Sequence, residues 1–296
     1  MDTNNFFSFS RIAMVMKREI MENWKTNLYR LIGIYAAFAL VMILHMWTMS
    51  SGRSSQISFT TYCSNIMGTF VFIIGIASIA YAANIMENMI TKEKRIAFLM
   101  LPATMIEKFV ARFLIVTVGM AAAIIVAASL AEITRYLVLP LFNLPEAFHQ
   151  SVLYHLLSMA AIDGEQVFRG SGSALNMSYQ NWLGELCGWA FLVWSHSLYI
   201  LGGSYSYKKP FFKTLGTLML ISILCSVLSV HIISWVGNDG MRSFAEWLEA
   251  NFQWVTLNKL LSLGVAFFSA FTMFNWWLSY RLFTRSQVIK PKFRLL

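Results

Sequence analysis

Residues 91–113 read TKEKRIAFLMLPATMIEKFVARF, and this stretch joins two long apolar runs of the chain. Lysine and arginine lie near both of its ends, so it is a poor candidate for a membrane span, because charged side chains are costly in hydrocarbon. Its middle, IAFLML, is more apolar than an ordinary hydrophilic loop. The stretch therefore predicts a basic, partly apolar helical connection on one side of a membrane.

The local signals divide this connection into two helices. Thr91 can cap a short helix over Lys92–Leu101, and Pro102 ends it, because proline disfavours a helical conformation at the residue before it. Thr104 and Glu107 then have the spacing of a capping box, in which each side chain accepts from a free backbone N–H at a helix start. We expect a helix, a sharp break and a second helix leading into the next span; the alternative is a basic linker in which the capping pattern is accidental.

The rest of the chain has the composition of a membrane protein. Of its 296 residues 57% are hydrophobic and only 12% are charged, with a mean hydropathy of +0.59, whereas soluble domains carry about 25% charged residues. Six runs are long enough to cross about 30 Å of hydrocarbon as helices. We expect an all-α integral membrane protein whose six transmembrane helices lie near Leu31–Met49, Ile66–Asn84, Phe113–Ala131, Trp182–Gly202, Thr214–Val236 and Lys259–Tyr280.

The basic residues predict the orientation of these spans. Lysine and arginine are concentrated in the N-terminal segment, after span two, after span four and in the C-terminal tail, on alternate sides of the predicted bundle. Since cytoplasmic loops carry the excess of such residues, we expect both termini in the cytoplasm. The opposite side has only Arg53, Arg135, Arg169, Arg242 and Lys259. The +9 net charge follows from this asymmetry and needs no nucleic acid partner, while the basic loops suit anionic membrane lipid.

The chain is predicted to form a single membrane domain over residues 1–296. Residues 1–30 are expected to form a cytoplasmic amphipathic helix, residues 31–280 the six spans, and residues 281–296 a cytoplasmic tail. The N-terminal helix is predicted to lie in the membrane interface; the alternative is a short soluble helix packed on loops. Its apolar face is assigned to Phe9, Ile12, Ala13, Met16, Ile20 and Trp24, and its polar face to Arg11, Arg18, Glu22 and Lys25.

Two segments on the opposite side are predicted to contain helices of their own. Residues 132–181, after span three, are too long for open coil and end in a Gly/Ser-rich turn, GSGSALN. Between spans five and six, Phe244, Trp247, Leu248 and Phe252 have helical spacing, which predicts a short amphipathic helix.

Motifs for chemistry are not found. The Lys-Thr pairs Lys25-Thr26 and Lys213-Thr214 do not follow a glycine, so neither belongs to a P-loop. The five histidines show neither HExxH spacing nor paired cysteines, so no metal site is predicted. Ser195 and His196 are adjacent on a predicted helix and point about 100° apart, so they cannot form a catalytic dyad together. We therefore expect no enzyme activity and no cofactor bound by this chain.

Glu185 is the ionisable residue within the spans that merits attention. It lies about one turn into span four, where a carboxylate is either part of a substrate pathway or a structural group that reaches water or an external-loop partner. The structural interpretation is favoured, and the pathway role stays open.

The topology and the connecting helix together resemble the ABC-2-type permeases, the membrane subunits of ATP-binding-cassette exporters. The most specific stretch is RIAFLMLPATMIEKFVARFL, Arg95–Leu114, which is similar to the family's loop helix, LPxx sequence and basic residue entering span three. It is also similar to a bacterial subgroup with LPAT or LPAS followed by EKF. The topology covers the whole chain, while the residue-level match covers about twenty positions.

The resemblance implies a bacterial cytoplasmic (inner) membrane location and a separate ABC ATP-binding subunit that binds ATP and supplies the energy. The N-terminal helix would be the elbow helix, and Lys92–Leu101 the coupling helix that docks on that subunit. Two permease chains, as a homodimer or a heterodimer, would surround the pathway. The residues implied in docking are Lys92, Lys94 and Arg95 for orientation, exposed Ile96, Phe98, Leu99 and Met100 for a pocket on the partner, and Pro102 at the break.

Two other classes of function stay open. The chain could be a non-transporting membrane component, such as a scaffold, a sensor or an immunity protein, and it would then have no ATPase partner. A membrane-embedded enzyme would need a constellation of polar side chains that the sequence does not assemble.

Overall fold

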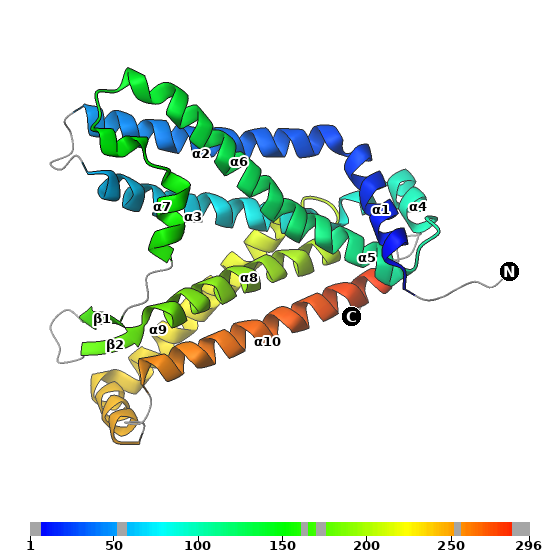
Figure 1. Cartoon of the computed structure of the whole chain (residues 1–296). Helices are drawn as coiled ribbons and strands as arrows, with labels where there is room; N and C mark the ends of the chain where they lie inside the picture. The colour runs from blue at the N-terminus through cyan, green and yellow to red at the C-terminus, as the bar shows by residue number, and fades with distance from the viewer. Residues whose placement is uncertain (1–6, 52–57, 161–164, 170–175, 252–255, 286–296) are drawn as a thin grey trace. The chain divides into compact units, whose positions relative to one another are not determined.

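The computed structural model describes residues 7–51, 58–160, 165–169, 176–251 and 256–285 (Figure 1). The chain forms two compact units. Unit 1 comprises Met1–Ile162 with Tyr280–Leu296, and unit 2 comprises Asp163–Ser279. The six-residue N-terminal end and most of the predicted tail, from residue 286, lie outside the described residues.

Unit 1 is helical throughout its described residues. In chain order, its elements are α1 (Phe9–Glu22), α2 (Trp24–Ser50), α3 (Phe59–Ala83), the 3-10 helix η1 (Asn84–Met89), α4 (Lys92–Leu99), α5 (Met105–Leu114), the π-helical turn η2 (Ile115–Gly119), α6 (Met120–Val138), the 3-10 turns η3 (Leu139–Leu141) and η4 (Glu146–His149), and α7 (Val152–Ala160). The last turn of α10, from Tyr280, also belongs to unit 1.

The core of unit 1 lies where α2, α3 and α6 pack together. Phe38 of α2 and Phe70 of α3 meet with ring centroids 4.4 Å apart, and Ala127 and Ala131 of α6 let that helix approach closely. In Figure 1, α6 crosses α2 obliquely, and the two helices pack closely. These three helices hold α1, α4 and α5 together at one end and the segment that follows α6 at the other.

The segment after α6 is ordered by two buried charged residues. Arg135 is fully buried and donates to the carbonyl oxygens of Phe148 and Gln150 at 2.7 and 2.8 Å. Glu132, 3.6 Å from Arg135, accepts from the backbone N–H of Val152 at the start of α7. The prediction of helical structure in residues 132–181 is thus confirmed for η3, η4 and α7.

Unit 2 begins with a feature that was not predicted. Strands β1 (Glu165–Arg169) and β2 (Asn176–Gln180) pair antiparallel, with Glu165 opposite Gln180. This hairpin is the one departure from an all-helical fold among the described residues. The predicted Gly/Ser-rich turn between the strands lies outside the described residues, except for Asn176, the first residue of β2.

Three long helices complete unit 2: α8 (Asn181–Tyr205), α9 (Pro210–Asn251) and α10 (Leu257–Thr284), the last of which ends in unit 1. α8 and α9 approach closely at Gly202, where an added Cβ would clash with the Thr214 side chain. α8 and α10 are joined by a buried hydrogen bond from Asn275 Nδ2 to Ser197 Oγ, 2.9 Å long.

α9 changes direction at Gly237, whose φ of 71° and ψ of 170° are not helical. This break lies directly after the predicted end of span five at Val236, and helix continues beyond it to Asn251. The short helix predicted between spans five and six is therefore confirmed as far as Asn251, and Phe252 lies outside the described residues.

Within the described residues, six helices are long and apolar enough to cross a membrane: Trp24–Ser50, Phe59–Met89, Met105–Leu141, Asn181–Tyr205, Pro210–Gly237 and Leu257–Thr284. Each contains the whole of one predicted span and is longer than it, and Met105–Leu141 extends well beyond the predicted Phe113–Ala131 at both ends. The length and composition of these helices identify a multi-pass membrane protein.

Candidate partner-binding segment

The short helix α4 begins where the sequence predicts. The hydroxyl oxygen of Thr91 accepts from the backbone N–H of Lys94 at 3.3 Å, which satisfies one of the free donors of the first turn. Glu93 lies in that turn, and hydrogen bonds from its own backbone N–H and from the Thr91 side chain lower the pKa of its carboxyl group. A carboxylate at this position also complements the positive end of the helix dipole.

The break between α4 and α5 is fixed from both sides. Thr104 and Glu107 form the predicted capping box, with distances of 2.8 and 3.3 Å between each side-chain oxygen and the backbone nitrogen of the other residue. The ammonium group of Lys108 donates to the carbonyl oxygen of Leu99 at 2.7 Å and so satisfies the last turn of α4. The predicted order of helix, break and helix is confirmed, with α4 ending at Leu99 rather than Leu101.

One face of α4 packs against unit 1, which corrects the expected docking surface. Phe98 is only 3% exposed and packs against Phe283 with a centroid distance of 6.2 Å; Phe283 also contacts Phe109 of α5. Arg95 is buried as well, and donates to the carbonyl oxygen of Met89 at 3.0 Å. The expectation that Phe98 is exposed for a partner is wrong, because the last turn of α10 supplies an aromatic surface that covers it.

The opposite face of α4 is exposed. Met100 is 77% exposed and Ile96 is 38% exposed, and Lys92, Glu93 and Ala97 complete this surface. We call these five residues the α4 face. Of the other predicted docking residues, Lys94 and Pro102 are exposed beside it and Leu99 is half-buried.

An ion pair attaches the start of α1 to this segment. Arg11 Nη2 lies 2.7 Å from Glu107 Oε1, and Ser8 donates its backbone N–H to the same oxygen at 2.7 Å. The hydrogen bond to Glu107 raises the pKa of the Arg11 guanidinium above its usual value. Glu107 therefore caps α5 and holds the start of α1 at the same time.

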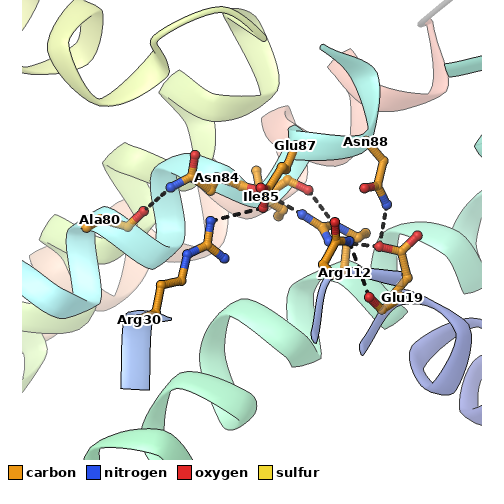
Figure 2. Close-up of polar contacts among 9 residues, drawn as sticks. Glu19, Arg30, Ala80, Asn84, Ile85, Glu87, Asn88 and Arg112 are labelled. Carbon is orange, nitrogen blue, oxygen red and sulfur yellow. Dashed lines mark hydrogen bonds and ion pairs between the residues drawn. The ribbon is translucent and has the colours of Figure 1, made fainter. Parts of the chain in front are cut away.

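A second, more deeply buried ion pair joins α1 to α5. Glu19 and Arg112 are 2.9 Å apart, and their side chains are 3% and 5% exposed. Asn88 of η1 donates its side-chain amide to Glu19, and Arg112 also donates to the carbonyl oxygens of Ile85 and Asn84, each at 2.7 Å (Figure 2). Every charge in this cluster has a hydrogen-bonded partner, as a buried charge requires.

α1 has one side that is buried against the other helices of unit 1 and one side that is exposed. Ile12, Val15 and Glu19 are buried against unit 1, whereas Phe9 and Trp24 are 80% and 55% exposed. Of the predicted apolar face, Ala13 and Ile20 are exposed too, Met16 is half-buried and Ile12 is buried. Glu19 was missed as a partner of Arg112; the signal in the sequence is its place on the stripe of Ile12 and Val15, at helical spacing.

Glu185, the residue predicted as a possible part of a substrate pathway, lies in unit 2. It lines an open cavity of about 400 Å³ together with Asn181 and Gly184 of α8 and Leu257 and Leu261 of α10. Its carboxylate accepts from Asn181 Nδ2 at 3.1 Å. Glu185 thus has a hydrogen-bonding partner, as the structural interpretation expects, and it also lines a space open to the surface.

The described residues contain no group of three His, Cys, Asp or Glu side chains arranged to hold a metal ion. Comparison of the chain with protein-family models, with curated proteins and with solved structures finds no match. The functional assignment therefore depends on the geometry of the candidate segment and on the sequence resemblance of Arg95–Leu114.

Proposed function

We propose that this chain is the membrane permease subunit of an ABC-2-type exporter in the bacterial cytoplasmic membrane. Its termini would be cytoplasmic, α1 would be the elbow helix and α4 the coupling helix. A separate subunit would bind and hydrolyse ATP and dock on the α4 face.

The observation that carries the proposal is that α4 has an exposed apolar face on one side and, on the other, buried contacts that hold it to the rest of unit 1. Ile96 and Met100 form a compact exposed apolar surface that suits a pocket on a partner. Lys92 lies beside them, where a charge at the edge of the contact would orient the partner. On the other side, Phe98 packs on Phe283 of α10, which also contacts Phe109 of α5, and the hydrogen bond from Lys108 to the Leu99 carbonyl joins α4 directly to α5. A displacement of α4 would therefore be transmitted to α5, which continues through η2 and α6 as the third span.

The two ion pairs of α1 also hold α1 against α5. Because Arg11 and Glu19 hold α1 on α5, the elbow helix and the coupling helix would move as one body. In this scheme ATP binding draws the two ATP-binding subunits together, and the paired permease chains change between inward and outward access. Glu185 and its cavity would be reached by the substrate in one of these states.

Co-purification tests this function. The tagged full chain, extracted from native membranes in mild detergent, should carry a stoichiometric soluble protein with a P-loop. Met100→Asp combined with Ile96→Asp should remove that protein, because a carboxylate on the apolar anchor cannot be desolvated without a partner charge.

The matched control is Met14→Asp on α1, where the side chain is 60% exposed and lies outside the α4 face. It should leave the partner bound. Recovery of the chain alone, folded and at normal yield, would instead favour the alternative, a non-transporting scaffold, sensor or immunity protein.

A further inference from the structure

A groove between α2 and α3, away from the α4 face, carries an inference that does not depend on the exporter proposal. It has a volume of about 380 Å³ and opens to the surface of unit 1. Its walls include Arg30, Gly33 and Ala37 of α2 and Ala77, Ala80 and Tyr81 of α3.

The groove exists because small residues line it. Gly33 is exposed, and a Cβ added there would meet no atom within 4 Å, while Ala37, Ala77 and Ala80 extend only a methyl group into the same space. From Ile73 to Tyr81 the groove follows α3 for about 12 Å, at 1.5 Å per helical residue. Both helices are spans, so this long apolar surface lies beside hydrocarbon.

A cationic group closes one end of the groove. Arg30 lies six residues into α2, whose first residues are the exposed Trp24 and Lys25, typical of a membrane interface. Side chains of a helix tilt toward its N-terminus, so the guanidinium lies nearer that interface than its own Cα. Its carbon lies 5.3 Å from the centre of the buried Tyr81 ring, which supports it from one side.

The guanidinium has donors left for a ligand. Its Nη2 donates to Glu87 Oε2 at 3.0 Å (Figure 2), and no other carboxylate or carbonyl accepts from it among the described residues. A guanidinium carries five N–H groups in a planar fork that fits phosphate oxygens. The side chain is 25% exposed, so these donors can be reached from the surface.

We propose that this groove binds one glycerophospholipid with an anionic headgroup. One acyl chain lies along Gly33, Ala37, Ala77 and Ala80, and the phosphate accepts hydrogen bonds from Arg30. A second protein helix fits the observations less well, because an apolar helix offers no acceptor to the guanidinium at this end of the groove. Glu87 holds Arg30 in position and is not a ligand of the lipid.

Native mass spectrometry of the delipidated full chain with added palmitoyl-oleoyl phosphatidylglycerol tests this. Gly33→Leu fills the groove at an exposed helical position and should weaken the first lipid-binding step at least about tenfold, since a bound chain loses most of its apolar contact. Gly75→Leu is the matched control: Gly75 is on α3, outside the groove, and an added Cβ also meets no atom within 4 Å. It should leave the step unchanged.

The charged end is tested separately. Arg30→Gln should weaken the same step roughly tenfold through loss of charge-assisted hydrogen bonds. Glu87→Gln should leave it as tight or tighter, because it removes a negative charge that competes with the phosphate for the Arg30 guanidinium. Equal lipid binding by the wild type and Gly33→Leu would overturn the proposal. So would conversion of a dimer to a monomer by Gly33→Leu with unchanged lipid binding, since a second copy would then occupy the groove.

Discussion

The guanidinium of Arg112 joins α1 to the end of α3. It donates to Glu19 Oε2 at 2.9 Å and to the carbonyl oxygens of Ile85 and Asn84 at 2.7 Å, in a site where both charged side chains are almost fully buried. Three segments that are distant in the sequence thus share one charged group. The position of α1 on unit 1 is therefore set by buried electrostatics as well as by the packing of Ile12 and Val15.

Glu19→Gln should destabilise the protein by about 3 kcal/mol or more, because it leaves the charge of Arg112 buried without its partner. Thermal unfolding of the detergent-solubilised chain, followed by circular dichroism, measures the effect. The control is Glu22→Gln, which breaks the exposed pair with Arg18, where the side chains are 44% and 46% exposed; its effect should stay below about 1 kcal/mol. Equal effects of the two substitutions would contradict the role of the buried pair.

Glu107→Gln should loosen α1 more than Arg11→Gln does. The first change weakens the capping box, the ion pair and the bond from the Ser8 backbone, whereas the second removes the ion pair from the side of the arginine, which is 28% exposed. Amide hydrogen exchange of Phe9–Glu22 should accelerate in both variants, and in the first also at the start of α5. Faster exchange confined to α5 in Glu107→Gln would show that Glu107 does not hold α1.

Phe98→Ala should lower the stability of the protein, whereas Met100→Ala should weaken partner binding. Phe98 is buried against Phe283, so its truncation should cost about 3–5 kcal/mol of stability. Met100 is 77% exposed, so its truncation should change stability by less than about 0.5 kcal/mol but weaken partner binding. The unfolding midpoint and the amount of co-purified partner give the two readouts. A stable Phe98→Ala variant that loses the partner would restore Phe98 to the docking surface.

Arg135→Leu should release the segment that follows α6. The substitution leaves the carbonyl oxygens of Phe148 and Gln150 without their donor and the carboxylate of Glu132 without a counter-charge. Hydrogen exchange should accelerate in residues 142–156, while α2 and α3 keep most of their protection. Ile133→Ala on the same helix, where the side chain is 55% exposed, should have little effect. Unchanged exchange in Arg135→Leu would refute this role.

Local signals explain what could be predicted. The six spans depend on runs of apolar residues, and the helix, break and helix of residues 91–114 depend on Thr91, Pro102, Thr104 and Glu107, whose effects reach only a few residues. The break before residue 238 likewise coincides with Gly237, whose positive φ suits a residue without a Cβ. Such features are encoded within one turn of the helix that they start or end.

Contacts between distant segments explain what was missed. Whether Phe98 or Met100 is exposed depends on Phe283, which lies at the end of the sixth span, four spans after α4. The partner of Glu19 is likewise on α5, and nothing in the sequence near Glu19 indicates Arg112 rather than another cation. The hairpin of β1 and β2 arises from the pairing of two short strands, which neither strand's sequence predicts alone.

Photo-crosslinking from the α4 face in native membranes tests the central claim most directly. A benzophenone side chain placed at Met100 should give one major adduct, with a soluble protein that carries a P-loop, and the same group at Met14 on α1 should not give it. That result would identify α4 as the contact with an ATP-binding subunit. Absence of an adduct from Met100, or an adduct only with proteins that lack a P-loop, would contradict the exporter assignment.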